Sequence, residues 1–470
     1  MVIRDSNKDV ISFLGGYQFK KNEEYRFNKY CIFVEQDIKT IVYNSLTGAI
    51  INVFKYELDN LDIRQSSMLS DYLIQNYFLV KKDFNEDEVI NEYRKWRSSY
   101  IGPNYLDSPS TFVIMTTSDC NARCPYCYEG KMKRREHMAS EYEEKISNYI
   151  INNHDFTKDI EVQFFGGEPL YNVNSINNIV GRLRTGGVKF HTTLISNAYL
   201  FNDKIVKLAK EFWMLRSVQV TLDGVDDKYN KIKRYIHKDD PNPFSTVIDN
   251  VKRLLDSGIE VAIRLNCSST NYDNLREVIE FLHTKFPEYV ASHQLRAYVW
   301  EIDQEVTEGK TQDLYTNMCL LNDLLNEYHM NVSPQLEFGI KSKHCMVDSG
   351  TTVFITEKGD MGVCEHYTES KFFGNVENPA NKDLQVLKDW RDYVSQDTPI
   401  CSNCSLKAIC YKLRECTDHH MCDEYAKKYR EHRVVTDLIE LVKQVETNKA
   451  CECHDRKNRC NIQNGRNNKQ

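Results

Sequence analysis

The sequence predicts an α/β protein whose centre is a partial barrel of strand–helix units. Two observations lead to this prediction. Short apolar segments alternate with helix-like segments through the middle of the chain, and a cysteine-rich segment with little regular pattern follows them. The 470 residues suffice for several domains, and we expect four regions, at 1–105, 106–335, 336–425 and 426–470.

The first region is expected to be a small winged-helix-like domain. Residues 30–37 and 39–51 alternate as two strands joined by a short turn, and residues 65–80 carry apolar side chains at helical spacing. A second helix is expected over 85–100, with Asn85 as its N-cap and acidic residues in its first turn. A segment with proline and glycine follows, which predicts a linker to the barrel.

The second region alternates strands with helices. We expect strands at 112–117, 160–165, 190–196, 217–223, 259–266 and 293–300. Repeated strand–helix units form a parallel sheet, and six of them predict an open or partial (β/α)6 TIM-like barrel. Active sites of such barrels lie at the C-terminal ends of the strands. The residues that follow each strand are therefore the first candidates for chemistry.

Composition narrows the class of protein. The net charge of −7 disfavours a nucleic-acid binder. The chain has no apolar run of roughly 18 residues, as a membrane span requires, and its first ten residues lack the apolar core of a signal peptide. Its 16 cysteines cluster at short spacings, which in a large chain is typical of metal thiolates rather than disulfides. We therefore expect a cytoplasmic protein with no membrane or nucleic-acid partner.

Three cysteines follow the first barrel strand: Cys120, Cys124 and Cys127, in a CxxxCxxC spacing. Three thiolates can hold three irons of a cubane [4Fe–4S] cluster and leave the fourth iron open, and an open position is typical of catalytic metal sites. With Tyr126 before the last cysteine, the motif resembles that of the radical S-adenosylmethionine (SAM) superfamily. In that family SAM chelates the fourth iron, and the reduced cluster cleaves it to a 5′-deoxyadenosyl radical. A CxxxCxxC motif alone would also suit a structural zinc knuckle.

Later motifs extend this resemblance over residues 110–300, among them FFGGEPL after the second strand, ISNA after the third and VTLDG after the fourth. The resemblance implies that SAM contacts Tyr126, Gly166, Gly167, Glu168, Pro169, Ser196, Thr221, Asp223 and Arg234. Tyr126 would lie against the adenine, and the two glycines would let backbone approach the SAM ammonium. Arg234 would grip the carboxylate through its two-point fork. By residue type alone, Thr221, Asp223 and Arg234 would equally suit strand-end caps or surface ion pairs.

A second group of cysteines lies near the C-terminus, at Cys345, Cys364, Cys401, Cys404, Cys410, Cys416 and Cys422. With Gly359 before Cys364 and a CxxC-x5-C run, it resembles the SPASM extension of radical SAM enzymes, which binds two auxiliary [4Fe–4S] clusters. The resemblance implies three clusters in all.

By the family's interleaving, Cys345, Cys364 and Cys416 would bind the nearer auxiliary cluster, and Cys401, Cys404, Cys410 and Cys422 the farther one. Cys416 departs from the pattern, because it comes six positions after Cys410 and Arg414 stands where the next cysteine is usual. The nearer cluster's fourth ligand stays open between Cys319 and a substrate thiolate, and two structural zinc sites are the alternative for the whole group.

The remaining cysteines have simpler interpretations. Cys31 and Cys267 lie in expected strands and Cys319 lies on an expected helix, so we expect them to be buried small hydrophobes. Cys451, Cys453 and Cys460 belong to a polar C-terminal tail that we expect to be mobile.

Radical SAM enzymes with this extension mostly modify peptides or proteins. The first region resembles the recognition domain of ribosomal-peptide maturases, where a leader peptide adds as a strand to a sheet edge; a simple cap on the barrel is the alternative. The resemblance implies a peptide maturase that cross-links a precursor peptide, most readily as a Cys thioether, with flavodoxin or ferredoxin as electron donor. The other candidates are a carbon–carbon cross-linking maturase, a formylglycine-forming enzyme like the anaerobic sulfatase maturases, and a zinc-binding adaptor.

Overall fold

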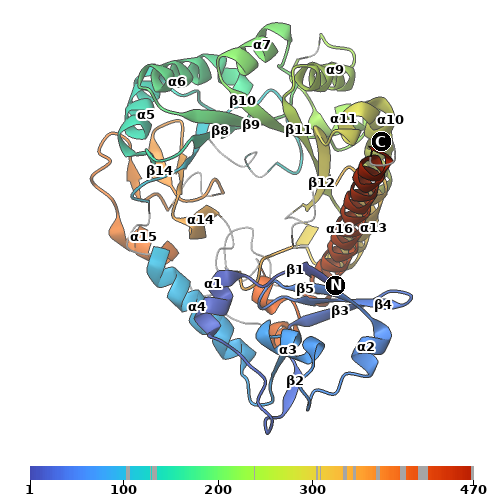
Figure 1. Ribbon diagram of the computed structural model, residues 1–470. Helices are drawn as coiled ribbons and strands as arrows, with labels where there is room; N and C mark the ends of the chain where they lie inside the picture. The colour runs from blue at the N-terminus through green and yellow to red at the C-terminus, as the bar shows by residue number, and fades with distance from the viewer. Residues whose placement is uncertain are drawn as a thin grey trace.

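The computed structural model describes residues 1–101, 106–127, 129, 135–237, 239–302, 305–306, 308–331, 336–341, 346–366, 371–391, 399–410 and 422–466. A parallel sheet with its outer helices forms one half of the molecule, and a smaller antiparallel domain forms the other (Figure 1). Two of the predicted cluster ligands, Cys345 and Cys416, lie outside the described residues. Within the described residues, no helix is long and apolar enough to cross a membrane.

All six predicted barrel strands are present and parallel. They are β7 (Thr111–Thr117), β8 (Ile160–Gly166), β9 (Phe190–Ser196), β10 (Leu215–Thr221), β11 (Glu260–Cys267) and β12 (Leu295–Glu301). They pair in chain order from β7 to β12. Because all six run in the same direction, their C-terminal ends meet at one edge, where the cysteine triplet follows β7.

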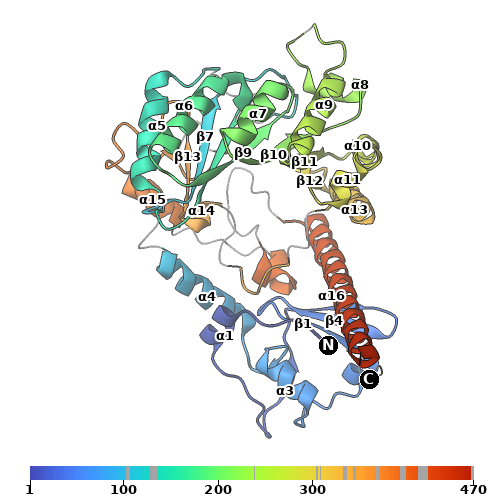
Figure 2. The ribbon, with the colours of Figure 1, turned by 45° about the horizontal axis from the view of Figure 1, so that its top comes forward.

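Helices connect these strands and cover the outer face of the sheet (Figure 2). They are α5 (Ser140–Asn153), α6 (Val173–Thr185), α7 (Asp203–Glu211), α8 (Asp227–Lys233), α9 (Pro243–Asp256), α10 (Tyr272–Lys285), α11 (Pro287–Ala291) and α13 (Thr311–Glu327). In α9, Val247, Val251 and Leu254 are fully buried and recur at helical spacing, which turns this face onto the sheet.

The cysteine-rich region extends the barrel sheet. Strand β13 (Thr352–Ile355) runs parallel to β7, and β14 (Asp360–Gly362) and β15 (Gly374–Asn375) continue it in antiparallel pairing. The sequence analysis expected no strands here, because two to four residues are too few to show a period. The described helices of this region are α14 (Met346–Ser349), α15 (Leu384–Arg391) and the short 3₁₀ helices η4 (Pro399–Asn403) and η5 (Lys407–Ile409).

The N-terminal domain has two antiparallel sheets. One has the order β1-β5-β4-β3, formed by Val2–Arg4, Ile50–Phe54, Lys39–Asn44 and Cys31–Glu35, and the other pairs β2 (Tyr25–Phe27) with β6 (Leu79–Lys81). The strand predicted over 39–51 is therefore wrong as one element. It splits at Gly48, whose φ of +83° makes a turn in which Gly48 N–H donates to Asn44 O.

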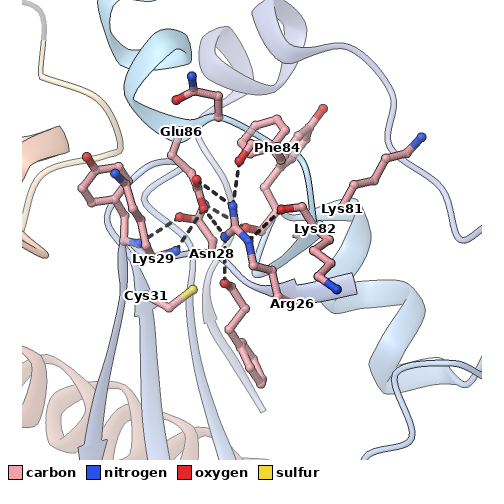
Figure 3. A network of polar contacts seen from close by, with 12 residues as sticks. Arg26, Asn28, Lys29, Cys31, Lys81, Lys82, Phe84 and Glu86 are labelled. Carbon is pink, nitrogen blue, oxygen red and sulfur yellow. Dashed lines mark hydrogen bonds and ion pairs between the residues drawn. The ribbon is translucent and has the colours of Figure 1, made fainter. Parts of the chain in front are cut away.

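Four helices complete the N-terminal domain: α1 (Lys8–Leu14), α2 (Lys55–Asp59), α3 (Met68–Gln75) and α4 (Glu86–Ile101). The predicted cap of α4 is confirmed, since Asn85 Oδ1 accepts the N–H of Glu88 at 3.3 Å. The guanidinium of Arg26 on β2 binds both carboxylate oxygens of Glu86, at 2.6 and 3.0 Å (Figure 3). This bidentate pair fixes the start of α4 against the β2–β6 sheet.

The last helix, α16 (Glu424–Arg466), joins the two halves (Figures 1 and 2). Its Leu438 and Val442 pack in one core cluster with Val34 and Ile41 of the N-terminal sheet. The helix continues over residues 451–466, and the mobility expected for this tail stays a prediction. That segment has no proline, and it places opposite charges at i and i+4, as in Glu452 and Arg456, which favours helix.

Candidate functional site

The cysteine triplet lies in the loop after β7, and its three thiols are half-buried. Cys120 Sγ accepts the N–H of Ala122 at 3.3 Å and an Nδ2–H of Asn197 at 3.9 Å. Burial, followed by the charges of Glu168, Cys124 and Cys127, raises the pKa of the Cys120 thiol to about 12. Thiols grouped in this way become thiolates only beside a cation, which cluster iron supplies.

The spacing of these side chains bears on the kind of metal site. Within the described residues, no three His, Cys, Asp or Glu side chains converge on a point that a single metal ion could hold. The thiolates of a cubane cluster each bind a different iron, so they stand farther apart than the ligands of one zinc ion. The three half-buried thiols of the loop after β7 are a donor set that suits a cubane with one open iron.

Gly166 and Gly167 bring the end of β8 against the cysteine loop. A Cβ on Gly166 would overlap Thr117 O, and a Cβ on Gly167 would overlap Asp119 O. The N–H of Gly167 donates to Thr117 O and that of Glu168 to Asp119 O, each at 3.0 Å. Close backbone approach is thus required here, between this turn and the loop that carries the thiols. The predicted approach of the two glycines to the SAM ammonium stays a prediction.

Glu168 ties this turn to the end of β9. Its carboxylate is 1% exposed and accepts the hydroxyl of Ser196 and the N–H of Asn197, each at 2.8 Å. Burial outweighs these hydrogen bonds and raises the pKa of Glu168 to about 7. Pro169 is also buried and begins the 3₁₀ helix η3 (Pro169–Asn172). Glu168, Pro169 and Ser196 therefore come together as predicted, while their contact with SAM stays a prediction.

Tyr126 and Asp223 meet in a buried polar group. The Tyr126 hydroxyl donates to Asp223 Oδ2 at 2.6 Å, and Asn266 Nδ2 donates to Asp223 Oδ1 at 3.2 Å. The sequence analysis missed the cation of this group, Lys233, whose Nζ lies 2.9 Å from Asp223 Oδ2 and 3.1 Å from the Tyr126 hydroxyl. Burial is the largest single effect and would lower the pKa of Lys233. The charges of Asp223, Tyr126, Cys124 and Tyr229 together outweigh it and hold that pKa well above its usual value.

Arg234, the predicted partner of the SAM carboxylate, points elsewhere. It caps α8 with φ +51° and is exposed, and its Nε donates to Lys231 O at 3.3 Å. Its neighbour Lys233 faces the cysteine loop instead, where Lys233 O accepts the N–H of Arg123 at 2.8 Å. Thr221 ends β10 and is half-buried. Tyr229 and Lys233 lie four residues apart on the buried face of α8. This helical spacing is the sequence signal that could have predicted that Lys233 points inward.

Asn121 is a second residue that the sequence analysis missed. It is fully buried, and its Oδ1 accepts Asn197 Nδ2 at 2.7 Å. Its own Nδ2 is buried without a hydrogen-bond partner among the described residues. A buried donor without a partner is costly, so this amide beside the triplet fits a site that a ligand acceptor completes.

The second cysteine group is also assembled. Burial, together with the charges of Cys410 and Cys422, raises the pKa of the Cys404 thiol to about 11. Cys401 begins a turn in which its carbonyl accepts the N–H of Cys404 at 3.3 Å. Cys364 follows β14 and packs against the barrel core. Cys31 and Cys267 are buried, as expected, whereas Cys319 on α13 is half-buried.

Comparison with known proteins agrees with this geometry. A family model described as Radical SAM superfamily matches residues 114–282. The radical SAM cyclopropyl synthase TigE of Paramaledivibacter caminithermalis is 22% identical over 394 residues, which cover 77% of this chain and 79% of that protein. An uncharacterised protein of Methanocaldococcus jannaschii is 26% identical over 285 residues, 59% of this chain and 92% of that one.

A solved structure shares the fold. Native anSMEcpe with bound AdoMet and Cp18Cys peptide aligns with a TM-score of 0.55 at 16% identity, over 72% of this chain and 99% of that chain. Residues 114–282, which the family model matches, contain the triplet, the GGEP turn and the ends of β9 and β10. These findings confirm the resemblance, and with it the binding of SAM and of the [4Fe–4S] cluster that the family implies. The central domain of this chain is thus a radical SAM domain, and the chain is a radical SAM enzyme.

Proposed function

We propose that this enzyme is a peptide maturase, which binds a precursor peptide by its leader segment and installs a cross-link in the core peptide. When bound, the cluster and SAM supply a 5′-deoxyadenosyl radical that removes a hydrogen atom from a core residue. The observation that carries the peptide part is the free edge of the N-terminal sheet. The presence of a peptide in the anSMEcpe structure supports the same substrate class.

The free edge is strand β3, which among the described strands pairs with β4 alone. In an antiparallel pair, residues that hydrogen-bond to the neighbouring strand alternate with residues that do not. Gln36 N–H donates to Lys39 O at the hairpin. The backbone N–H and C=O groups of Phe33 and Glu35 therefore point away from β4. The opposite edge is β1. There the guanidinium of Arg4 donates to Leu336 O at 2.9 Å and Glu337 O at 2.7 Å, which holds the segment 336–337 beside β1. An extended leader would therefore add to β3 rather than to β1.

Side chains beside β3 could contact a peptide that pairs with its free edge. Phe33 is 45% exposed, and its ring meets that of Phe27 edge to face at 5.1 Å. The adjacent residues Tyr25 and Arg26 line a groove of about 700 Å³, whose other wall is the loop 59–64. A strand paired to β3 would thus have an aromatic contact and a neighbouring groove for its side chains, which provide specificity in strand addition.

At the barrel, we assign the SAM carboxylate to Lys233 rather than Arg234, because Lys233 is the cation that faces the cysteine loop. Asn121 Nδ2 is the donor available for a second acceptor. Asp223 and Tyr126 then orient Lys233 and keep it protonated. The remaining contacts predicted for SAM, at Gly166, Gly167, Pro169, Ser196 and Thr221, are part of the same proposal.

The C-terminal region would hold two auxiliary [4Fe–4S] clusters in a SPASM domain. Cys401, Cys404, Cys410 and Cys422 would bind the farther one, and the grouping of the last three thiols supports this assignment. Cys345, Cys364 and Cys416 would bind the nearer one. With three cysteines, the nearer cluster would keep an iron for a substrate thiolate, which favours a thioether product and a reduced flavodoxin or ferredoxin as electron donor in the cytoplasm.

A carbon–carbon bond is the second candidate product, and a specific observation favours it. TigE is a cyclopropyl synthase by name, and its similarity covers 77% of this chain. The two products differ in their need for a cysteine. A thioether requires a cysteine in the core peptide and removes its free thiol, whereas a carbon–carbon bond leaves all thiols open to alkylation.

The three clusters and the SAM-cleaving activity are tested by measuring iron content, sulfide content and SAM cleavage after anaerobic reconstitution. We expect about twelve irons per chain from three cubanes, and about eight in Cys120→Ala/Cys124→Ala/Cys127→Ala, which should also lose 5′-deoxyadenosine formation. About four irons in the wild type would remove the auxiliary clusters from the proposal. Zinc in place of iron would contradict the family assignment itself.

Peptide recognition is tested by measuring the binding of a candidate precursor peptide. Phe33→Asp should weaken binding of its leader at least tenfold and leave SAM cleavage without peptide unchanged. Ile38→Asp is the matched control, because Ile38 is 67% exposed in the turn of the same hairpin and does not lie on the edge. Equal binding by the two variants would contradict docking on β3. An aldehyde in the product, captured by a hydrazide, would indicate formylglycine instead of a cross-link.

A further inference from the structure

Helix α16 begins at the farther cysteine group. Asp423 follows Cys422 directly, and its Oδ1 accepts the N–H of Ala426 at 2.7 Å, which caps the first turn. The N-terminal end of a helix carries a partial positive charge. This end of α16 therefore lies beside thiols that become negative when they bind iron.

Arg430, on the second turn of α16, reaches the same thiols. It is only 8% exposed, and its Nη1 lies 3.6 Å from Cys410 Sγ and 3.7 Å from Cys422 Sγ. The two sulfurs come from different segments of the chain, one after η5 and the other before α16. One guanidinium thus bridges two of the four predicted ligands. The charge of Lys427, one turn earlier, also acts on Cys404.

We propose that Arg430 is a positioning residue of the farther auxiliary cluster, which holds Cys410 and Cys422 together and raises the reduction potential of that cluster. The inference rests on the proposed function only in requiring this cluster. A guanidinium stays protonated in proteins, and four thiolates give a cubane a net negative charge. Hydrogen bonds to cluster sulfurs and nearby positive charge both favour the more negative, reduced state.

The test is an anaerobic redox titration of the reconstituted enzyme, followed by electron paramagnetic resonance. The signal of the farther cluster is identified by its loss in Cys401→Ala/Cys404→Ala. In Arg430→Gln we expect its reduction equilibrium to shift at least tenfold toward the oxidised state, which is about 59 mV for one electron. Arg430→Lys should recover part of this shift, because it keeps the charge and loses the two-point geometry.

Lys443→Gln is the matched control. It removes one positive charge from the same helix, but Lys443 is exposed and lies thirteen residues farther along, about 20 Å at the rise of an α-helix. Its farther-cluster potential should equal that of the wild type. Iron content is the second readout, and a loss of about four irons in Arg430→Gln that Arg430→Lys restores would also support the positioning role.

Two outcomes would overturn the inference and differ from each other. A full complement of about twelve irons with an unchanged potential in Arg430→Gln would overturn the role of Arg430 and leave the auxiliary clusters standing. About four irons in the wild type would overturn the auxiliary clusters and the role of Arg430 together, while the radical SAM cluster would stay intact.

Discussion

The ammonium of Lys233 and the carboxylate of Asp223 form an ion pair of 2.9 Å, with side chains 3% and 2% exposed. Lys233 ends α8 and Asp223 follows β10, so the pair joins two elements at the edge of the sheet that carries the cysteine triplet. The carbonyl of Lys233 also accepts the N–H of Arg123, between two of the cysteines. The same residue therefore supplies a buried charge and a backbone anchor to the cysteine loop.

Asp223→Asn should destabilise the enzyme strongly. The substitution leaves the Lys233 ammonium buried without its counter-ion, and loss of one partner of a buried pair costs about 3 to 5 kcal/mol in free energy of unfolding. Urea unfolding followed by circular dichroism measures this loss. Asp223→Asn/Lys233→Met removes both charges and should recover most of it. A double variant as unstable as the single one would show that the pair is not the source of the loss.

SAM binding should separate Lys233 from Arg234. Lys233→Gln removes the inward cation and should weaken SAM binding about 10- to 100-fold, the value of a charge-assisted hydrogen bond of roughly 1.5 to 3 kcal/mol. Arg234→Gln removes an exposed cation one residue away and should bind SAM as the wild type does. Equilibrium dialysis with labelled SAM on the reconstituted proteins measures both. A larger loss in Arg234→Gln would restore the assignment that the sequence favoured.

The comparison of Lys233 with Arg234 shows what the sequence could predict of this site. Residues that directly follow a strand, such as Cys120, Glu168 and Asp223, could be placed because strand ends were readable from apolar runs. The choice between two adjacent cations needed a different signal, the helical spacing that places Lys233 on the same face of α8 as Tyr229. The choice also depends on the left-handed conformation of Arg234, which turns its side chain outward and leaves Lys233 on the buried face.

The elements of the fold also separate into those that the sequence could predict and those that it could not. The six barrel strands and the Asn85 cap were predictable, because period, length and flanking residues agree in them. Strands β13 to β15 were not, because their two to four residues become strands only by pairing, β13 with β7, β14 with β13 and β15 with β14. The split of 39–51 depended on a single positive φ at Gly48. In each case the missing information is tertiary contact or backbone conformation.

Gly167→Ala should remove the SAM-binding cluster. The added Cβ would overlap Asp119 O, one residue before Cys120, so the cysteine loop must move. We expect a loss of about four irons per chain and at least a tenfold fall in SAM cleavage. Gly181→Ala is the control, because Gly181 lies within α6 and its Cβ would meet Phe212 Cζ, after α7, at an ordinary 3.6 Å. Full iron content in Gly167→Ala would show that the loop tolerates the displacement.

Glu168 should make stability depend on pH in a defined window. Burial raises its pKa in the folded protein to about 7, from 4.5 when the group is fully solvated. Between these values the native state keeps a proton that the unfolded chain has released. Stability therefore falls as pH rises through this window, whereas a carboxylate with a lowered pKa would have the opposite effect. The shift corresponds to roughly 3 kcal/mol, complete below pH 4.5 and lost above pH 7.

Glu168→Gln isolates this effect, because the amide does not titrate. The substitution also weakens the hydrogen bonds to Ser196 and Asn197, which shifts the free energy of unfolding by the same amount at every pH. The informative quantity is thus the slope of that free energy with pH, measured by urea unfolding of both proteins under anaerobic conditions from pH 5 to 8. The wild type should lose stability relative to Glu168→Gln up to about pH 7 and run parallel to it beyond. Parallel curves over the whole range would mean that the hydrogen bonds from Ser196 and Asn197 to the carboxylate, and not its burial, decide its protonation.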